Sequence, residues 1–256
     1  MQKNTFRQKE GVFVAEGINV IEVALEASID IEALYYDPIE VEEHIVAQQI
    51  LHRALVKGIR VYPLVPNIIS KISNTINPQP ILAVLPRLDT ELVELKEMDF
   101  LVIGVGIKDP GNAGTIMRSA QAAGAQGVIF CDNSVDIYNP KLVRASAGAL
   151  FYLSLVEASS FEETILKIKS LGFFTVASLV DKGIDYTEAN LVRKIALVVG
   201  NEANGLNDQI AQLNDLCVTI PMKGRTESLN VGMATTVLCF EAARQRRQLG
   251  NAHGTY

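Results

Sequence analysis

The stretch Val218-Thr-Ile-Pro-Met-Lys-Gly-Arg-Thr-Glu-Ser-Leu-Asn230 places a polar, glycine-containing loop between an apolar strand and a helix that continues through Arg247. Backbone N–H groups of such a loop, and of the helix N-terminus that follows it, bind anions and nucleotide-like cofactors. Two other segments have the same build: residues 108–118 after a strand at 100–105, and residues 200–206 after a strand at 195–199. Because ligands of open α/β sheets collect at the carboxyl ends of strands, the three loops predict a binding site there.

Apolar strands alternate with helices on the N-terminal side of that stretch, which predicts an α/β fold. Uniformly apolar runs such as 100–105 are typical of a sheet that is covered on both faces. Gly124 and Gly172 stand where helices are expected to end, and Asn112 and Asn207 where helices are expected to begin. We expect strands at 100–105, 127–131, 151–156, 173–179, 195–199 and 216–221, and helices at about 112–123, 140–148, 160–170, 207–213 and 229–247.

The first ninety residues form a smaller α/β pattern. The charged stretch 87–99 reads as an exposed connector, so we expect a domain boundary near 87–98, a first domain over 1–90 that folds independently, and a second over 91–256. In the first domain we expect strands at 12–15, 31–36, 60–64 and 81–85, and helices at about 17–27, 41–57 and 68–72.

Composition describes a soluble globular protein of 256 residues with 48% hydrophobic side chains. Neither a signal peptide nor a membrane-spanning segment is visible, which favours the cytoplasm. Cys131, Cys217 and Cys239 lack the CxxC spacing of metal sites, so we expect reduced core residues and no metal.

The net charge of −6 argues against a nucleic-acid partner unless the cations cluster locally. Clusters do occur, and each has an ordinary structural alternative, either a solvated helix face or close helix packing. The candidate RNA-binding cations are Arg7 and Lys9 at the start, Arg53, Lys57 and Arg60 at helical i, i+4, i+7 spacing, and Lys141 and Arg144 on a short helix.

The polar loops leave alternatives open for single residues. A dinucleotide fingerprint fails, because Gly104 and Gly106 are not followed by the third glycine. Arg118 points away from its helix's apolar stripe, so it is either an ordinary surface arginine or an arginine whose guanidinium binds a phosphate. Ser228 and Asn230 either cap the last helix or serve a ligand.

In order and spacing, the three segments resemble the motifs of the SpoU (TrmH) family of RNA ribose 2′-O-methyltransferases, in the SPOUT superfamily. Residues 6–17 are similar to the start of that family's auxiliary RNA-binding domain, whose fold resembles certain ribosomal proteins. The resemblance covers nearly the whole chain. It implies a catalytic α/β domain with a trefoil knot, a homodimer, S-adenosylmethionine as cofactor and RNA as partner.

The resemblance also implies roles for single residues. The expected catalytic residues are Asn112, Arg118, Glu202, Ser228 and Asn230, and the expected cofactor-binding residues are Gly200, Ile220, Met222, Leu229 and Asn230. The chain departs from the family pattern at Gly232-Met233, where a Ser-Val pair is common, and at Arg225, a further candidate RNA contact inside the third loop.

The expected function is therefore S-adenosylmethionine-dependent 2′-O-methylation of a ribose in structured RNA, with 23S ribosomal RNA preferred over transfer RNA. An inactive RNA-binding or ribosome-assembly factor is the alternative from another class, and a nicotinamide dehydrogenase is a more distant one. For the homodimer we expect an interface on the last helix, unless its apolar stripe packs on its own sheet. That stripe consists of Val231, Thr235, Leu238 and Ala242.

Overall fold

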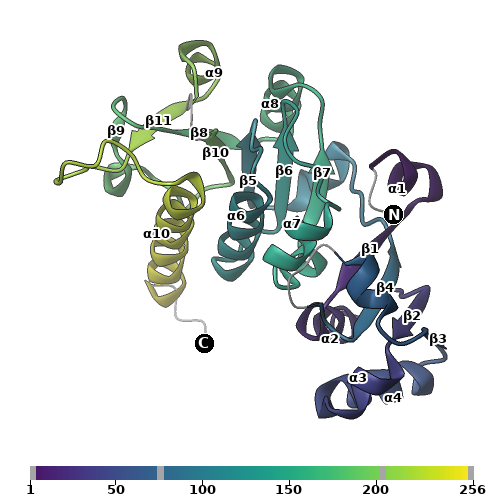
Figure 1. The fold of residues 1–256 in the computed structure, drawn as a ribbon. Helices are drawn as coiled ribbons and strands as arrows, with labels where there is room; N and C mark the ends of the chain where they lie inside the picture. The colour runs from purple at the N-terminus through teal and green to yellow at the C-terminus, as the bar shows by residue number, and fades with distance from the viewer. Residues whose placement is uncertain (1–3, 74–77, 202–205, 253–256) are drawn as a thin grey trace. The chain divides into compact units, whose positions relative to one another are not determined.

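The computed structural model describes residues 4–73, 78–201 and 206–252, which belong to two compact units (Figure 1). The first unit consists of residues 1–88 and 138–152, and the second of residues 89–137 and 153–256. The break at Leu88 lies inside the range expected from sequence. The sequence predicted two consecutive domains. It did not predict that residues 138–152 would belong to the first unit.

The first unit contains a four-stranded sheet in the order β1-β4-β2-β3. Strand β4 is antiparallel to both of its neighbours, and β2 and β3 are parallel. The strands are β1 (Val12–Glu16), β2 (Ala33–Tyr36), β3 (Arg60–Pro63) and β4 (Ile81–Pro86). The helices are α1 (Asn4–Glu10), α2 (Ile18–Glu26), α3 (Pro38–Glu42), α4 (Ile45–Val56), α5 (Ile68–Ile72), α7 (Pro140–Ala145) and the 3₁₀ helix η2 (Ala149–Tyr152).

Two helices replace the single helix expected at 41–57. Asp37 caps α3 by accepting hydrogen bonds from the backbone N–H groups of Ile39 at 3.0 Å and Glu40 at 3.3 Å, and Pro38 stands at the first helical position. Helix α1 has no counterpart among the expected elements, because its polar residues run directly into the first strand.

The segment 138–152 is part of the first unit's core. The Tyr138 ring packs 4.7 Å from the Phe13 ring, and its hydroxyl accepts a hydrogen bond from the Leu88 N–H at 2.7 Å. The Arg87 guanidinium lies over the same ring, 4.5 Å from its centre. Tyr138 is fully buried, so β1 and α7 belong to one folding unit although they are far apart in sequence.

The second unit contains a seven-stranded parallel sheet in the order β7-β6-β5-β10-β8-β11-β9. The strands are β5 (Phe100–Val105), β6 (Gly127–Cys131), β7 (Ser154–Glu157), β8 (Phe174–Leu179), β9 (Ile184–Asp185), β10 (Ile195–Gly200) and β11 (Leu216–Thr219). The helices are η1 (Leu92–Glu97), α6 (Pro110–Ala122), α8 (Phe161–Ser170), η3 (Tyr186–Glu188), α9 (Asp208–Gln212) and α10 (Val231–Ala252).

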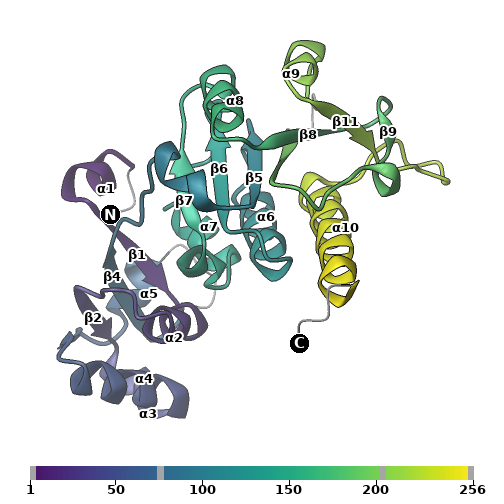
Figure 2. The same cartoon turned by 180° about the vertical axis from the view of Figure 1, so that it is seen from behind.

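Helices cover both faces of this sheet, so both faces of its central strands are buried and carry apolar side chains. Every residue of β5 and of β6 is buried, as the uniformly apolar runs predicted. Helices α6 and α10 lie side by side (Figures 1 and 2). Among the described residues, no helix combines the length and the apolar composition needed to cross a membrane.

The helix ends confirm three of the four expected caps. Gly124 and Gly172 follow α6 and α8 with left-handed φ values of 86° and 87°. Asn207 caps α9 through a hydrogen bond from the backbone N–H three residues on. The expectation for Asn112 is wrong, because Asp109 caps α6 and accepts the Asn112 N–H at 2.8 Å.

Candidate functional site

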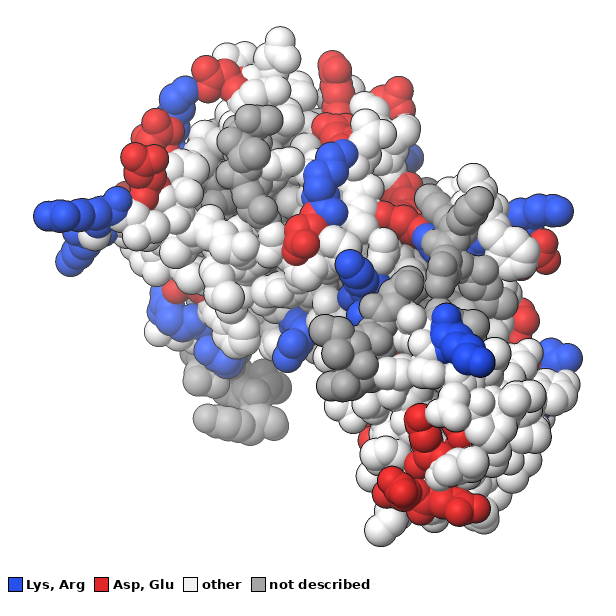
Figure 3. Space-filling view, in the orientation of Figure 1, with Lys and Arg blue, Asp and Glu red and all other residues white. Residues whose placement is uncertain are grey.

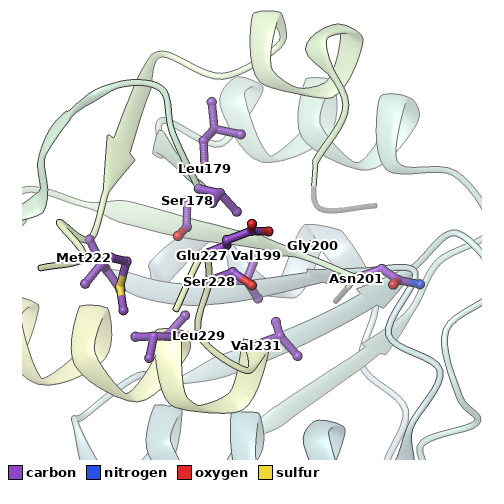
Figure 4. Close-up of a pocket in the computed structure, with 13 residues that line it drawn as sticks. Ser178, Leu179, Val199, Gly200, Asn201, Met222, Glu227, Ser228, Leu229 and Val231 are labelled. Carbon is purple, nitrogen blue, oxygen red and sulfur yellow. The ribbon is translucent and has the colours of Figure 1, made fainter. Parts of the chain in front are cut away.

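A pocket of the second unit lies where the carboxyl ends of β8 and β10 meet the segment from β11 to α10 (Figure 4). These three strands are parallel, so their carboxyl ends lie at the same edge of the sheet. The pocket is lined by Ser178, Leu179, Val180, Val199, Gly200, Asn201, Ile220, Met222, Glu227, Ser228, Leu229, Val231 and Ala234.

Four of the five expected cofactor-binding residues line this one pocket, namely Gly200, Ile220, Met222 and Leu229. They come from two loops that are twenty residues apart in sequence, and the parallel pairing of strands brings them together. The fifth, Asn230, is not among the lining residues. Their role in binding a cofactor stays a prediction.

The sequence did not predict the pocket residues that β8 supplies, which include Ser178 and Leu179. Strand β10 lies between β5 and β8 in the sheet, and no local pattern specifies that order. Glu227 and Asn201 were also missed, although each is adjacent to an expected residue. Proximity to Ser228 and to Gly200 was the signal that could have found them.

Asn230 joins the third loop to the first. Its side-chain Oδ1 accepts hydrogen bonds from the backbone N–H groups of Gly232 at 2.9 Å and Met233 at 3.3 Å, so Asn230 does cap α10. Its Nδ2 donates to Asn112 Oδ1 at 2.9 Å, which connects α10 with α6. Thus Asn230 caps α10 and joins the third loop to the first, and its role in a site stays a prediction.

The loop after β10 is connected to the loop after β5 in a similar way. Asn201 Nδ2 donates to the carbonyl oxygen of Gly106 at 3.1 Å. Gly106 has a φ of 64°, a left-handed conformation that glycine adopts without strain. All three polar strand-end loops are therefore linked by side-chain amides.

The other expected catalytic residues differ in placement. Ser228 lines the pocket and has no side-chain hydrogen bond within the described part of the chain, so a capping role is not supported. Arg118 is exposed on α6, outside the pocket lining, and has no hydrogen-bond or ion-pair partner among the residues described. Ile116 and Ala120 of its helix's expected apolar stripe are fully buried. Glu202 lies outside the described residues.

The expected RNA-binding cations of the first unit need two corrections. Arg7 is only 3% exposed within α1, so burial removes it from the set. Arg60 begins the edge strand β3, in agreement with the strand expected at 60–64, so it does not continue the helical series of cations, which ends with Lys57 at the end of α4. Lys9 is exposed, as expected.

Several of these cations already have partners within the first unit. Arg53 lies 3.6 Å from a carboxylate oxygen of Glu22, and Lys57 donates to the carbonyl oxygen of Leu25 at 2.8 Å. Arg144 lies 3.8 Å from a carboxylate oxygen of Glu16. In the second unit, Figure 3 shows basic side chains at the tip of the segment between β11 and α10, where Lys223 and Arg225 lie exposed.

Polar loops at the carboxyl ends of a parallel sheet, closed by a helix N-terminus, define an α/β protein with a site for a nucleotide-like ligand. A model of the SpoU rRNA methylase family matches residues 99–240, and a model of the MRM3-like substrate-binding domain matches residues 1–83. The chain belongs to the SpoU rRNA methylase family.

Relatives in sequence and structure cover nearly the whole chain. The 23S rRNA (guanosine(2553)-2′-O)-methyltransferase RlmP of Bacillus subtilis is 30% identical over 235 residues, 91% of this chain and 89% of that protein. The 23S rRNA (uridine(2479)-2′-O)-methyltransferase of Streptomyces viridochromogenes is 32% identical over 249 residues, covering 94% and 85%. The AdoMet-bound rRNA methyltransferase from Sinorhizobium meliloti is similar with a TM-score of 0.82 at 29% identity, covering 95% and 91%.

Proposed function

We propose that this protein transfers the methyl group of S-adenosylmethionine to the 2′-hydroxyl of a ribose in 23S ribosomal RNA. The observation that carries the proposal is the strand-end pocket, which gathers residues of two family motifs in a chain of the SpoU family. Transfer RNA is the second substrate to test, because some relatives are described as tRNA/rRNA methyltransferases.

The residues of the pocket fit this cofactor. Leu179, Val199 and Leu229 offer apolar surface for a purine ring, and backbone groups at the strand ends offer donors and acceptors for its edges. The Glu227 carboxylate lines the same pocket and is complementary to a positive charge. The cofactor supplies a sulfonium methyl group that is already activated, so the protein's task is alignment and charge stabilisation.

In this proposal the expected catalytic residues position the ribose and its developing charge. Arg118 has a permanently charged fork and no partner among the described residues, which suits a clamp for phosphate or alkoxide. The Asn112–Asn230 hydrogen bond holds the first and third motifs together, and both would face the ribose. Ser228 offers a hydroxyl in the pocket itself, and Glu202 keeps its expected role.

The proposal includes a homodimer with a revised interface. The stripe expected to form it is buried inside the single chain: Val231, Thr235, Leu238 and Ala242 are each at most 6% exposed. The opposite side of α10 carries Met233 and Phe240, both exposed, with Val237 between them. An exposed apolar strip on a long helix is typical of a subunit interface.

RNA affinity in this proposal comes mainly from the first unit, in line with the substrate-binding model that matches residues 1–83. Lys9, Arg53, Lys57 and Arg60 remain candidate contacts there, and so do Lys141 and Arg144 of the same unit. Arg225 is the candidate contact beside the pocket.

The test is a map of ribose methylation over total RNA from a strain with and without the gene. One 23S ribosomal RNA position that loses its 2′-O-methyl group, and regains it on incubation with purified protein and S-adenosylmethionine, is the expected result. Loss confined to transfer RNA would favour the second substrate. An unchanged map, together with no calorimetric binding of millimolar S-adenosylmethionine, would refute the activity.

A further inference from the structure

One face of the first unit's sheet is only partly covered. Phe13, Leu34 and Leu85 are fully buried on one face, and neighbouring residues along each strand point to the other face. On that other face Tyr35 and Tyr62 are direct partners in the parallel register of β2 and β3. A hollow lies over them, and its lining also includes Glu10, Glu32 and Arg60.

The two tyrosines form a stacked aromatic pair. Their ring centres lie 5.5 Å apart with an interplanar angle of 28°. Tyr62 is on the edge strand and is 43% exposed, so its ring is accessible from solvent. Neither hydroxyl has a hydrogen-bond partner among the described residues, which leaves both open to a ligand.

Arg60 extends this aromatic surface. It stands two residues before Tyr62 on β3 and therefore on the same face. Its Nε donates to the carbonyl oxygen of Glu32 at 3.2 Å, while its terminal nitrogens have no partner within the described residues. A guanidinium held in this way can stack on a base or pair with a phosphate.

The charges around the hollow favour a base over a phosphate backbone. Glu10 and Glu32 line it together with Arg60, so its net charge does not attract phosphates. Carboxylates accept hydrogen bonds from the amino groups of bases, and tyrosine faces stack on any unpaired base. In duplex RNA those base faces are hidden.

We propose that Tyr35, Tyr62 and Arg60 form a stacking platform for an unpaired nucleobase of the RNA substrate. The inference rests on the proposed function for its choice of RNA as ligand. It assigns the first unit a recognition mode that depends on base stacking at the open sheet face, in addition to the cation contacts expected from sequence.

The test measures the affinity of the full-length protein for a short fluorescent single-stranded oligoribonucleotide of mixed sequence, and for the same strand in a duplex. We expect tighter binding of the single strand, and Tyr62→Ala should weaken it by about 5- to 150-fold. Tyr62→Phe should retain most of the affinity, because the ring remains. Tyr152→Ala is the matched control, since Tyr152 is 49% exposed in the same unit but does not line the hollow.

The salt dependence separates stacking from phosphate contact. Tyr62→Ala should lower affinity at every salt concentration and leave the slope unchanged, whereas each lost phosphate contact would flatten it by about 0.7 for a single strand. The chain has no tryptophan, so quenching of its tyrosine emission by the oligonucleotide gives a second readout, which Tyr62→Ala should reduce.

Failure of the platform and failure of the methylation proposal are distinguishable. Wild-type methylation of 23S ribosomal RNA, measured separately, tests the activity, and the oligonucleotide tests the platform whatever that result. Equal affinities of wild type and Tyr62→Ala, or no preference of wild type for the single strand, would overturn the platform. Circular dichroism of each variant establishes that the affinities belong to folded protein.

Discussion

Arg118 is an expected catalytic residue whose role a single substitution can test. It is exposed, it lies outside the pocket lining, and no described residue pairs with its guanidinium. We predict that Arg118→Ala lowers the rate of methyl transfer by about 10²–10³, the usual cost of removing one preorganised charge contact to a transition state. Cofactor affinity should stay unchanged. Methyl incorporation into the identified RNA and calorimetry measure the two quantities.

The matched control for this prediction is Arg247→Ala. Arg247 is also an exposed arginine of the second unit, but it lies on α10 sixteen residues beyond the helix start. Its removal should leave turnover near that of wild type. If Arg118→Ala keeps more than about a third of wild-type turnover, far above the loss expected of a charge clamp, Arg118 is an ordinary surface arginine.

The three cysteines should differ in reactivity. Burial raises the pKa of the Cys131 thiol to about 12, with a smaller contribution from Asp132, and burial raises the pKa of Cys239 to about 12 as well. At pH 8 only about 10⁻⁴ of such a thiol is the reactive thiolate. Burial also raises the pKa of Cys217, which is only half-buried.

We therefore predict that iodoacetamide at pH 8 modifies Cys217 first in the native protein. Cys131 and Cys239 should remain unmodified until urea exposes them, and peptide mass spectrometry reads out all three sites. A rise in pH towards 9 should accelerate the Cys217 reaction, while Cys131 and Cys239 should stay unmodified on that timescale because they remain buried and almost entirely protonated. Native modification of Cys131 at the rate of Cys217 would contradict this order.

At the scale of elements, Gly232 permits the contact between α6 and α10. A Cβ atom at this position would lie 2.9 Å from Thr115 Cγ2 and 3.0 Å from Thr115 Cβ, closer than atoms in proteins normally pack. The glycine that stands in place of the serine of the family pattern thus has a steric reason, and nothing in the structure explains Met233. In the same region Ser119 and Thr236 join the two helices through a hydroxyl pair at 2.6 Å.

We predict that Gly232→Ala destabilises the protein by up to about 2 kcal/mol. Overpacking typically costs about 1–3 kcal/mol, and the higher helix propensity of alanine offsets at most about 1 kcal/mol of that cost at this second position of α10. Urea unfolding measures the difference, and the double variant Gly232→Ala/Thr115→Ser should recover part of it because Cγ2 is gone. Equal or greater stability of Gly232→Ala would show that the two helices separate without cost.

Local patterns predicted most elements of this chain, because each depends on short-range chemistry. The ranges of β5 and β6 agree with the apolar runs at 100–105 and 127–131, and the glycines after α6 and α8 mark their ends. The position of β10 between β5 and β8 was not predictable, since strand order depends on pairings between distant residues. The trefoil knot implied by family resemblance stays a prediction for the same reason.

The candidate site was predictable in part. The polar loops predicted a site at the strand ends, and the family resemblance implied Gly200, Met222 and Leu229, which the structure places around one pocket. The contribution of Ser178 and Leu179 required knowledge of which strand pairs with β10. Which side of α10 packs inward was also undetermined, because both sides carry apolar residues at helical spacing.

At the scale of the whole molecule, residues 138–152 belong to the first unit, although residues 89–137 of the second unit separate them in sequence from residues 1–88. We predict that a fragment of residues 1–90 is much less stable than the unit, because it lacks the fully buried Tyr138. Loss of a buried aromatic costs about 3–5 kcal/mol, and a domain has only about 5–15 kcal/mol in total.

A matched fragment makes this prediction testable. Residues 1–88 joined to 138–152 by a flexible glycine–serine linker restore the Phe13–Tyr138 contact. Thermal unfolding followed by circular dichroism should show a cooperative transition for the joined fragment, at a higher temperature than any transition of residues 1–90. If the two fragments unfold at the same temperature, the segment 138–152 is not needed for the fold of the first unit.

The last prediction concerns assembly. The proposed dimer uses the outward side of α10, where Phe240 is 43% exposed and Met233 and Val237 continue the strip. A carboxylate placed there would have to be desolvated without a partner, so Phe240→Glu should yield a monomer while wild type is a dimer. Light scattering at micromolar concentration measures both masses. Leu166→Glu, which changes a leucine on α8 that is even more exposed, at 59%, should remain dimeric. A wild-type mass of 27.9 kDa, that of one chain, would refute the dimer.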